Sequence, residues 1–248
     1  MLPDGWEAIA ANGIAAWPTF DADERERLAD TAAVMASLKR WEAANRFALT
    51  DEMKVVISLQ AARLVLELGV DWYNDMGSIV VQPTMMVRTN ARPTAARGVF
   101  TEEPMAILGE TAYRGAVVIA WDSARDAARH PEHGHDVVLH EFAHQLDLRN
   151  GIVDGTPPLK DAAERQRWID VCTPALQRVR HDTAHQRRGV LDPYAGTNPG
   201  EFFAVSTEVF FTRPHDLRLA QAELYEVLAD FYLQDPAARA GAWSDSGR

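Results

Sequence analysis

The chain has 248 residues and is 47% hydrophobic, enough to build a sizeable core. Its formal net charge of −11 argues against direct nucleic-acid binding, which needs a basic surface for phosphates. The single cysteine, Cys172, excludes an internal disulfide framework. The chain also lacks an apolar run of about eighteen residues and a basic, apolar leader, so we expect no membrane partner and a cytoplasmic location.

The first quarter of the chain is predicted to be helical. Residues 21–43 carry acids early, as a helix start prefers, and place apolar side chains at helical spacing. Residues 49–70 predict a second helix. Thr50 or Asp51 is its expected N-cap, and Gly69 its expected stop.

The middle of the chain changes to β-branched and apolar runs bounded by turn-forming residues. These runs predict strands at 78–82, 85–89 and 115–121, which would form a small mixed or antiparallel sheet. The strand at 115–121 has two interpretations. It could lie at the edge of the sheet and pair with the backbone of an extended peptide, or it could be a central strand.

After residue 136 the pattern returns to helix. Asp136 can cap a helix whose apolar stripe includes Leu139, Phe142 and Leu146, and the sequence "RNG" at 149–151 is expected to end it. This is the segment that carries the polar residues of most interest.

Three further helices are expected downstream. Residues 160–172 form the first, with Pro174 breaking or kinking its far end. Asn198 and Pro199 look like the N-cap and first residue of a helix that runs through Thr212. Pro214 opens the last helix, through about Leu233.

This order of helices, a small sheet and helices again predicts one α+β domain spanning 1–248, because no linker interrupts it. Within it we expect an N-terminal helical part at 1–75, a catalytic core at 76–235 and a flexible tail at 236–248.

The segment "VVLHEFAHQLD" places His140 and His144 four residues apart. Positions four apart share one face of a helix at about 6 Å, so both imidazoles can bind one cation. Glu141 lies one step round the helix and can reach a water on that cation. This is the His-Glu-x-x-His arrangement of zinc hydrolases.

Zinc suits this chemistry, because a catalytic site uses three protein ligands and one open position for water. The ion lowers the pKa of that water, and Glu141 would take its proton. Three alternatives remain. The histidines could be core residues bonded to main-chain carbonyls, or an exposed pair. A purely structural zinc site is disfavoured, because such sites usually use four ligands rich in cysteine.

A third ligand must come from downstream. In the apolar segment 200–211, Glu201 and Glu208 lie seven apart on one helix face. Glu201 is either a ligand or a capping residue, since Asn198-x-x-Glu201 has capping-box spacing. Glu208 is a reserve ligand or an acceptor for a histidine N–H. The downstream candidates are Asp154, Glu164, His181, His185, Glu201 and Glu208.

Other polar residues near the motif also have two interpretations. Asp147 either orients a ligand imidazole or bonds to the loop that follows the helix. The histidines in "RHPEHGHD" could bind metal, but a solvated loop leading into the helix is favoured. They are His130, His133 and His135.

The segments "LHEFAHQLD" and "DPYA…EFFAV…E…FF" resemble the zinc peptidase family of Mlc titration factor A, also called the DgsA anti-repressor. More distantly, they resemble the catalytic domain of anthrax lethal factor. The resemblance implies a zincin-like fold in which His140, His144 and Glu201 hold one zinc ion and Glu141 is the catalytic base. It also places Tyr194 beside the metal, where its phenol could bind an oxyanion; otherwise Tyr194 is an ordinary loop aromatic.

The leading expectation is therefore a zinc metallopeptidase acting on peptides, with aminopeptidase-like cleavage implied by the resemblance. The same resemblance implies an alternative from another class, a regulatory protein that sequesters a transcriptional repressor of sugar uptake. Nothing in the sequence indicates the surface that such a repressor would bind.

Overall fold

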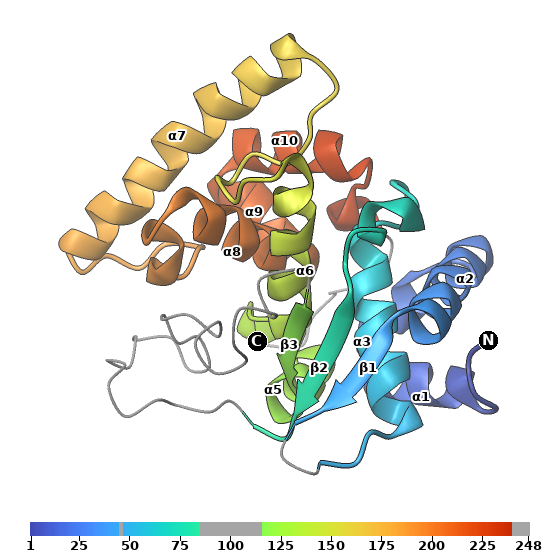
Figure 1. The fold of residues 1–248 in the computed structure, drawn as a ribbon. Helices are drawn as coiled ribbons and strands as arrows, with labels where there is room; N and C mark the ends of the chain where they lie inside the picture. The colour runs from blue at the N-terminus through green and yellow to red at the C-terminus, as the bar shows by residue number, and fades with distance from the viewer. Residues whose placement is uncertain (45–46, 85–115, 240–248) are drawn as a thin grey trace.

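The computed structural model describes residues 1–44, 47–84 and 116–239, and in it a small sheet lies against a larger group of helices (Figure 1). The predicted α+β class is confirmed. In the described segments, no helix combines the length and the apolarity needed to cross a membrane. The α-helices are α1 (Trp6–Gly13), α2 (Ala22–Leu38), α3 (Asp51–Leu64), α5 (Trp121–Arg129), α6 (Val137–Asp147), α7 (Ala162–Ala184), α8 (Pro199–Thr212), α9 (Pro214–Ala220) and α10 (Ala222–Tyr232). The 3-10 turns are η1 (Trp17–Thr19), η2 (Val70–Tyr73), η4 (Pro131–His133), η5 (Leu148–Asn150), η6 (Pro193–Gly196) and η7 (Pro236–Ala238).

The described sheet has the strand order β1 (Arg40–Ala43), β2 (Ser78–Gln82) and β3 (Ala116–Ala120). Both strand pairs are parallel rather than antiparallel. The strands predicted at 78–82 and 115–121 are present. The strand predicted at 85–89 lies outside the described residues. Whether β3 is an edge strand or a central strand is therefore not decided by the described residues.

Strand β1 corrects the sequence prediction, which continued the first long helix to residue 43. Helix α2 ends at Leu38, and the backbone of Lys39 is extended. The Lys39 ammonium donates to the main-chain carbonyl of Met76 at 2.9 Å, which draws the following residues alongside β2. Pairing with a distant strand therefore overrides the local helical pattern.

Helix α3 lies at the centre of the fold and is buried on nearly all sides. Thr50 caps it by accepting from the Met53 amide at 3.3 Å, as one of the two expected caps. The helix ends at Leu64, earlier than expected, and Gly69 (φ +90°) instead precedes η2. Helix α3 packs against α1, α2 and α6.

Three other helices differ from the sequence prediction. Helix α5 follows β3 directly, where no helix was expected. Helix α7 continues past Pro174 to Ala184, because Asp170 and Pro174 are both exposed and water can replace the missing bond. The final helix is split at Gln221 into α9 and α10, which lets the apolar faces of both halves reach the core.

The end of the chain is partly packed. Pro236 and Ala237 are buried, and the Arg239 guanidinium pairs with the Glu24 carboxylate at 2.9 Å. Residues 236–239, predicted as part of a flexible tail, thus contact the N-terminal half, and residues 240–248 lie outside the described residues.

Helix α6 is placed by packing on three sides. It contacts α8, α3 and β3 (Figure 1). Its apolar stripe is fully buried: Val138, Leu139, Phe142, Ala143 and Leu146. Such a helix has little freedom to rotate or slide, so its polar side chains are held in fixed directions.

Candidate metal centre

The start of α6 is fixed by a buried carboxylate. Asp136 Oδ1 accepts from the amides of Val138 and Leu139 at 3.0 and 3.1 Å, which confirms the predicted N-cap. Its other oxygen accepts from the Gln60 side chain on α3. Burial raises the pKa of Asp136 to about 6.

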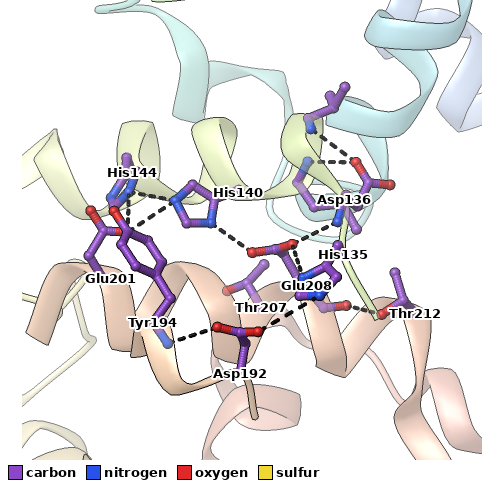
Figure 2. A network of polar contacts seen from close by, with 12 residues as sticks. His135, Asp136, His140, His144, Asp192, Tyr194, Glu201, Thr207, Glu208 and Thr212 are labelled. Carbon is purple, nitrogen blue, oxygen red and sulfur yellow. Dashed lines mark hydrogen bonds and ion pairs between the residues drawn. The ribbon is translucent and has the colours of Figure 1, made fainter. Parts of the chain in front are cut away.

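The two histidines of α6 face one another. Their rings are 4.8 Å apart at 81°, and the two Nε2 atoms are separated by 3.2 Å (Figure 2). His140 is only 7% exposed, and neither ring bonds a main-chain carbonyl among the described residues. These contacts rule out both alternatives, the exposed pair and the carbonyl-bonded core histidines.

Glu201 enters the same space from the first turn of α8. Asn198 caps this helix through its side chain, which accepts from the Glu201 amide at 2.9 Å. The Glu201 carboxylate does not fold back on the N-cap but points at the imidazoles. Its Oε2 lies 3.1 Å from His140 Nε2 and 3.5 Å from His144 Nε2 (Figure 2).

These three atoms have the spacing of ligands around one cation. In a tetrahedral zinc site with bonds of about 2.0–2.1 Å, neighbouring ligands are about 3.3 Å apart, which matches the observed 3.1 to 3.5 Å. Apart from its approach to the two imidazoles, Glu201 Oε2 is buried and has no hydrogen-bond partner in the described chain. No other trio of His, Cys, Asp or Glu among the described residues is grouped so closely.

The electrostatics of the site favour a cation. Burial opposes ionisation of Glu201, but the two imidazoles outweigh it and hold its pKa well below the usual range. Burial likewise lowers the pKa of His140, but Glu201 and Glu208 outweigh it and raise that pKa well above 6.5. The same carboxylates that favour a proton here would favour a metal ion in its place.

Glu208 supports His140 from behind. Its Oε1 lies 2.7 Å from His140 Nδ1, and its Oε2 accepts from the Asp136 amide at 2.7 Å (Figure 2). Glu208 is 2% exposed and turned away from the other imidazole. This places it as an acceptor for a histidine N–H rather than in the ligand trio.

Glu141 and Tyr194 flank the trio. Glu141 is partly exposed, and burial raises its pKa. Tyr194 comes from η6, where Asp192 accepts from its amide at 2.8 Å, and its ring lies 6.2 Å from that of His140. Burial and the nearby Glu201 raise the pKa of Tyr194 above its usual range, so the phenol keeps its proton.

Comparison with known proteins agrees with this geometry. The family model described as glucose-regulated metallo-peptidase M90 matches residues 1–233. The chain belongs to this M90 family. Similar relatives include the Synechocystis protein slr2042, which is 34% identical over 95% of this chain and 86% of its own length. Mlc titration factor A of Edwardsiella ictaluri is 32% identical, covering 88% and 83%, and that of Pectobacterium atrosepticum is 30% identical, covering 97% and 90%. The resemblance to the Mlc titration factor A family is therefore confirmed.

Membership of the M90 family implies a metallopeptidase with a bound metal ion. In this M90 member, the described residues that can hold such an ion are His140, His144 and Glu201. The other downstream ligand candidates lie outside this trio and make contacts with residues near them in the chain. Asp154 accepts from the Thr156 amide and Glu164 from the Lys160 amide. His181 and His185 lie beside each other with tilted rings at the exposed end of α7.

The other acidic and histidine candidates of this M90 chain fall into different environments. Asp147 is fully buried, and its Oδ2 accepts from the amide of Gly155 at 2.8 Å, in the loop after α6. His130 and His133 are exposed, as expected for a solvated loop. His135 differs, because its ring stands 3.9 Å from both Glu208 and Asp192 (Figure 2).

Two residues that support the site were missed from the sequence. Gln60 and Arg63 on α3 are both buried, and the Arg63 guanidinium donates to the Gln60 side chain at 2.7 Å and to the Phe211 carbonyl at 3.1 Å. Gln60 in turn holds Asp136, the cap of α6. A glutamine and an arginine inside an apolar helix were the available signal, since buried polar groups need partners.

Proposed function

We propose that the chain is a zinc-dependent peptidase in which His140, His144 and Glu201 hold the ion and Glu141 is the general base. The observation that carries this proposal is the triangle of ligand atoms, with sides of 3.1, 3.2 and 3.5 Å. Two imidazoles and one carboxylate, with a fourth position open, form the donor set of catalytic zinc.

A bound zinc ion would supply a polarised water and Lewis acidity toward the substrate carbonyl. Glu141 then takes a proton from the attacking water and passes it to the leaving amine. The carboxylate form of Glu141 accepts the proton in the first step, and the carboxyl group formed returns it in the second. Tyr194 keeps its phenolic proton and donates a hydrogen bond to the developing oxyanion.

The finer proposal is aminopeptidase-like cleavage of short peptides. It rests on the likeness to the Mlc titration factor A family alone. An alanine p-nitroanilide and its N-acetylated counterpart test it directly. An aminopeptidase hydrolyses the free amine much faster than the blocked substrate, and equal rates on the two would exclude this specificity.

The central experiment is Glu141→Gln, with Glu132→Gln as the matched control. Glu132 is an exposed acid outside the site, so its variant makes the same change in charge without touching the trio. We expect Glu141→Gln to keep its zinc and to lose about 10²–10⁴-fold in peptide hydrolysis, while Glu132→Gln keeps both. Full activity in zinc-loaded Glu141→Gln would exclude Glu141 as the base.

A second function is supported by the name that several relatives carry, Mlc titration factor A. We propose binding of a transcriptional repressor as the alternative, independent of peptide hydrolysis. The Glu141→Gln protein separates the two roles. If it no longer hydrolyses peptides but binds a purified repressor as tightly as the unmutated protein, binding does not depend on catalysis. Absence of binding by both proteins would reject the alternative.

A further inference from the structure

We propose that Asp147 is a positioning residue that orients the imidazole of His144 with one carboxylate oxygen and anchors the loop beside Glu201 with the other. The inference rests on the proposed function, since it assigns a second support to the same metal centre. It makes one carboxylate the link between two ligands that come from different helices.

The two ligand imidazoles differ in how they are supported. His140 Nδ1 faces Glu208 at 2.7 Å, whereas His144 Nδ1 is buried and has no hydrogen-bond partner among the described residues. An imidazole that binds metal through Nε2 carries its proton on Nδ1, and that N–H almost always donates to a carboxylate, a carbonyl or water. His144 Nδ1 therefore needs an acceptor, and none of the hydrogen bonds of the described residues supplies one.

Asp147 offers that acceptor. It follows His144 by three residues on α6, so the two side chains share one helix face. Side chains on a helix lean toward its N-terminus, which tilts Asp147 back over the turn that carries His144. Asp147 is fully buried, and its Oδ1 has no hydrogen-bond partner in the described chain. A buried donor and a buried acceptor, both unpaired, thus lie one turn apart on α6. They are not hydrogen-bonded to one another in this structure, so the proposed hydrogen bond forms by a turn of these side chains when the metal binds.

The second oxygen of Asp147 reaches toward α8. Oδ2 accepts from the Gly155 amide at 2.8 Å, and the Gly155 carbonyl accepts from the Trp168 indole at 2.9 Å. Gly155 packs so closely on Pro199 that an added Cβ would lie 2.3 Å from the Pro199 carbonyl oxygen. Pro199 is two residues before Glu201, so the anchored loop sets the first turn of α8.

Asparagine distinguishes these two roles from simple space filling. Asp147→Asn keeps the shape and one acceptor oxygen but replaces the other with an amide N–H donor. Only one of the Gly155 amide and the His144 N–H can then be satisfied. The matched control is Asp154→Asn, which removes the same charge from the same region. Asp154 is exposed and bonds only locally, to the Thr156 amide at 3.0 Å.

The experiment measures zinc affinity by competition with a chromophoric chelator, and proton exchange at His144 Nδ1 by long-range nitrogen–proton NMR of the zinc-loaded protein. In the unmutated protein we expect the His144 Nδ1 proton to be as protected from exchange as that of His140. In Asp147→Asn we expect zinc binding about 10–100-fold weaker and loss of that protection. Asp154→Asn should change neither.

Two outcomes overturn the inference. One is unchanged zinc affinity and unchanged His144 protection in Asp147→Asn, which would leave Asp147 as a loop anchor only. The other is a His144 Nδ1 proton in the unmutated zinc protein that exchanges freely, a result that holds even if Asp147→Asn fails to fold. Failure of the proposed function looks different, because the unmutated protein would then not bind zinc, or Glu141→Gln would stay active.

Discussion

The close approach of Gly155 to α8 predicts that Gly155→Ala is far more destabilising than an alanine at an otherwise similar glycine. Gly155 has φ +76°, and its added Cβ would overlap the Pro199 carbonyl. Gly151, in the same loop, has φ +88°, and an added Cβ there meets nothing within 4 Å. Comparison of the two alanine variants separates the cost of the left-handed backbone from the cost of the steric overlap with Pro199.

The magnitudes follow from the contacts. A left-handed backbone costs an alanine about 1–2 kcal/mol, so Gly151→Ala should lower the free energy of unfolding by about that much. Gly155→Ala carries the same cost and must also push the loop away from Pro199. That movement breaks the bond from the Gly155 amide to Asp147 and leaves a buried carboxylate oxygen unsatisfied, for about 1–3 kcal/mol more. We expect a total loss of about 2–5 kcal/mol for Gly155→Ala.

Urea unfolding of the metal-free variants measures both values. With a slope of about 2–3 kcal/mol/M, the two midpoints should differ by about 1 M. Zinc affinity should fall in Gly155→Ala but not in Gly151→Ala, because only the former displaces the first turn of α8. Equal losses of stability in the two variants would refute the argument, since both would then reflect backbone conformation alone.

Two further predictions concern buried ionisable groups. Burial raises the pKa of the Cys172 thiol from 9.0 to about 12, so a disulfide reagent at pH 8 should label the native protein about 10³-fold more slowly than the urea-unfolded chain; labelling at equal rates would contradict this. Burial raises the pKa of Asp136 from 3.8 to about 6. The folded protein therefore binds more protons than the unfolded chain between about pH 4 and 6. The free energy of unfolding should fall by about 3 kcal/mol as the pH rises through that window. Comparison of metal-free unmutated and Asp136→Asn protein by urea unfolding across pH 4–8 isolates this slope, and parallel pH profiles would show that Asp136 does not titrate as inferred.

The helices that carry the ligands were predictable because their signals are local. Asp136 and Asn198 each cap a helix within three residues of their own position. His140 and His144 share a face through helical periodicity alone. The sequence left Glu201 open between capping and ligation. The structure shows why both descriptions had merit, since Asn198 satisfies the Glu201 amide and thereby leaves the Glu201 carboxylate free for the imidazoles.

The features that sequence reasoning missed depend on partners far away in the chain. Strand β1 is extended because it pairs with β2, which lies nearly forty residues later. Arg63 finds its acceptor at Phe211, and Gln60 finds its acceptor at Asp136, and no local pattern specifies either contact. The break between α9 and α10 likewise follows from what each half packs against.

The charges buried around α6 explain why the ligand trio and its supports belong to one system. Asp136, Asp147 and Glu208 are each at most 2% exposed. Among the described residues, Arg63 is the only Arg or Lys that is also buried. Arg63 lies on the Asp136 side of this group, so at the end near Glu201 and His144 the described residues offer no buried Arg or Lys, and the positive charge there is a proton on the imidazoles or a bound cation. Buried carboxylates without such compensation are unfavourable in a folded protein. A divalent ion bound at the triangle of Nε2 and Oε2 atoms would supply the missing positive charge, so metal binding and folding stability are expected to be coupled through the same side chains.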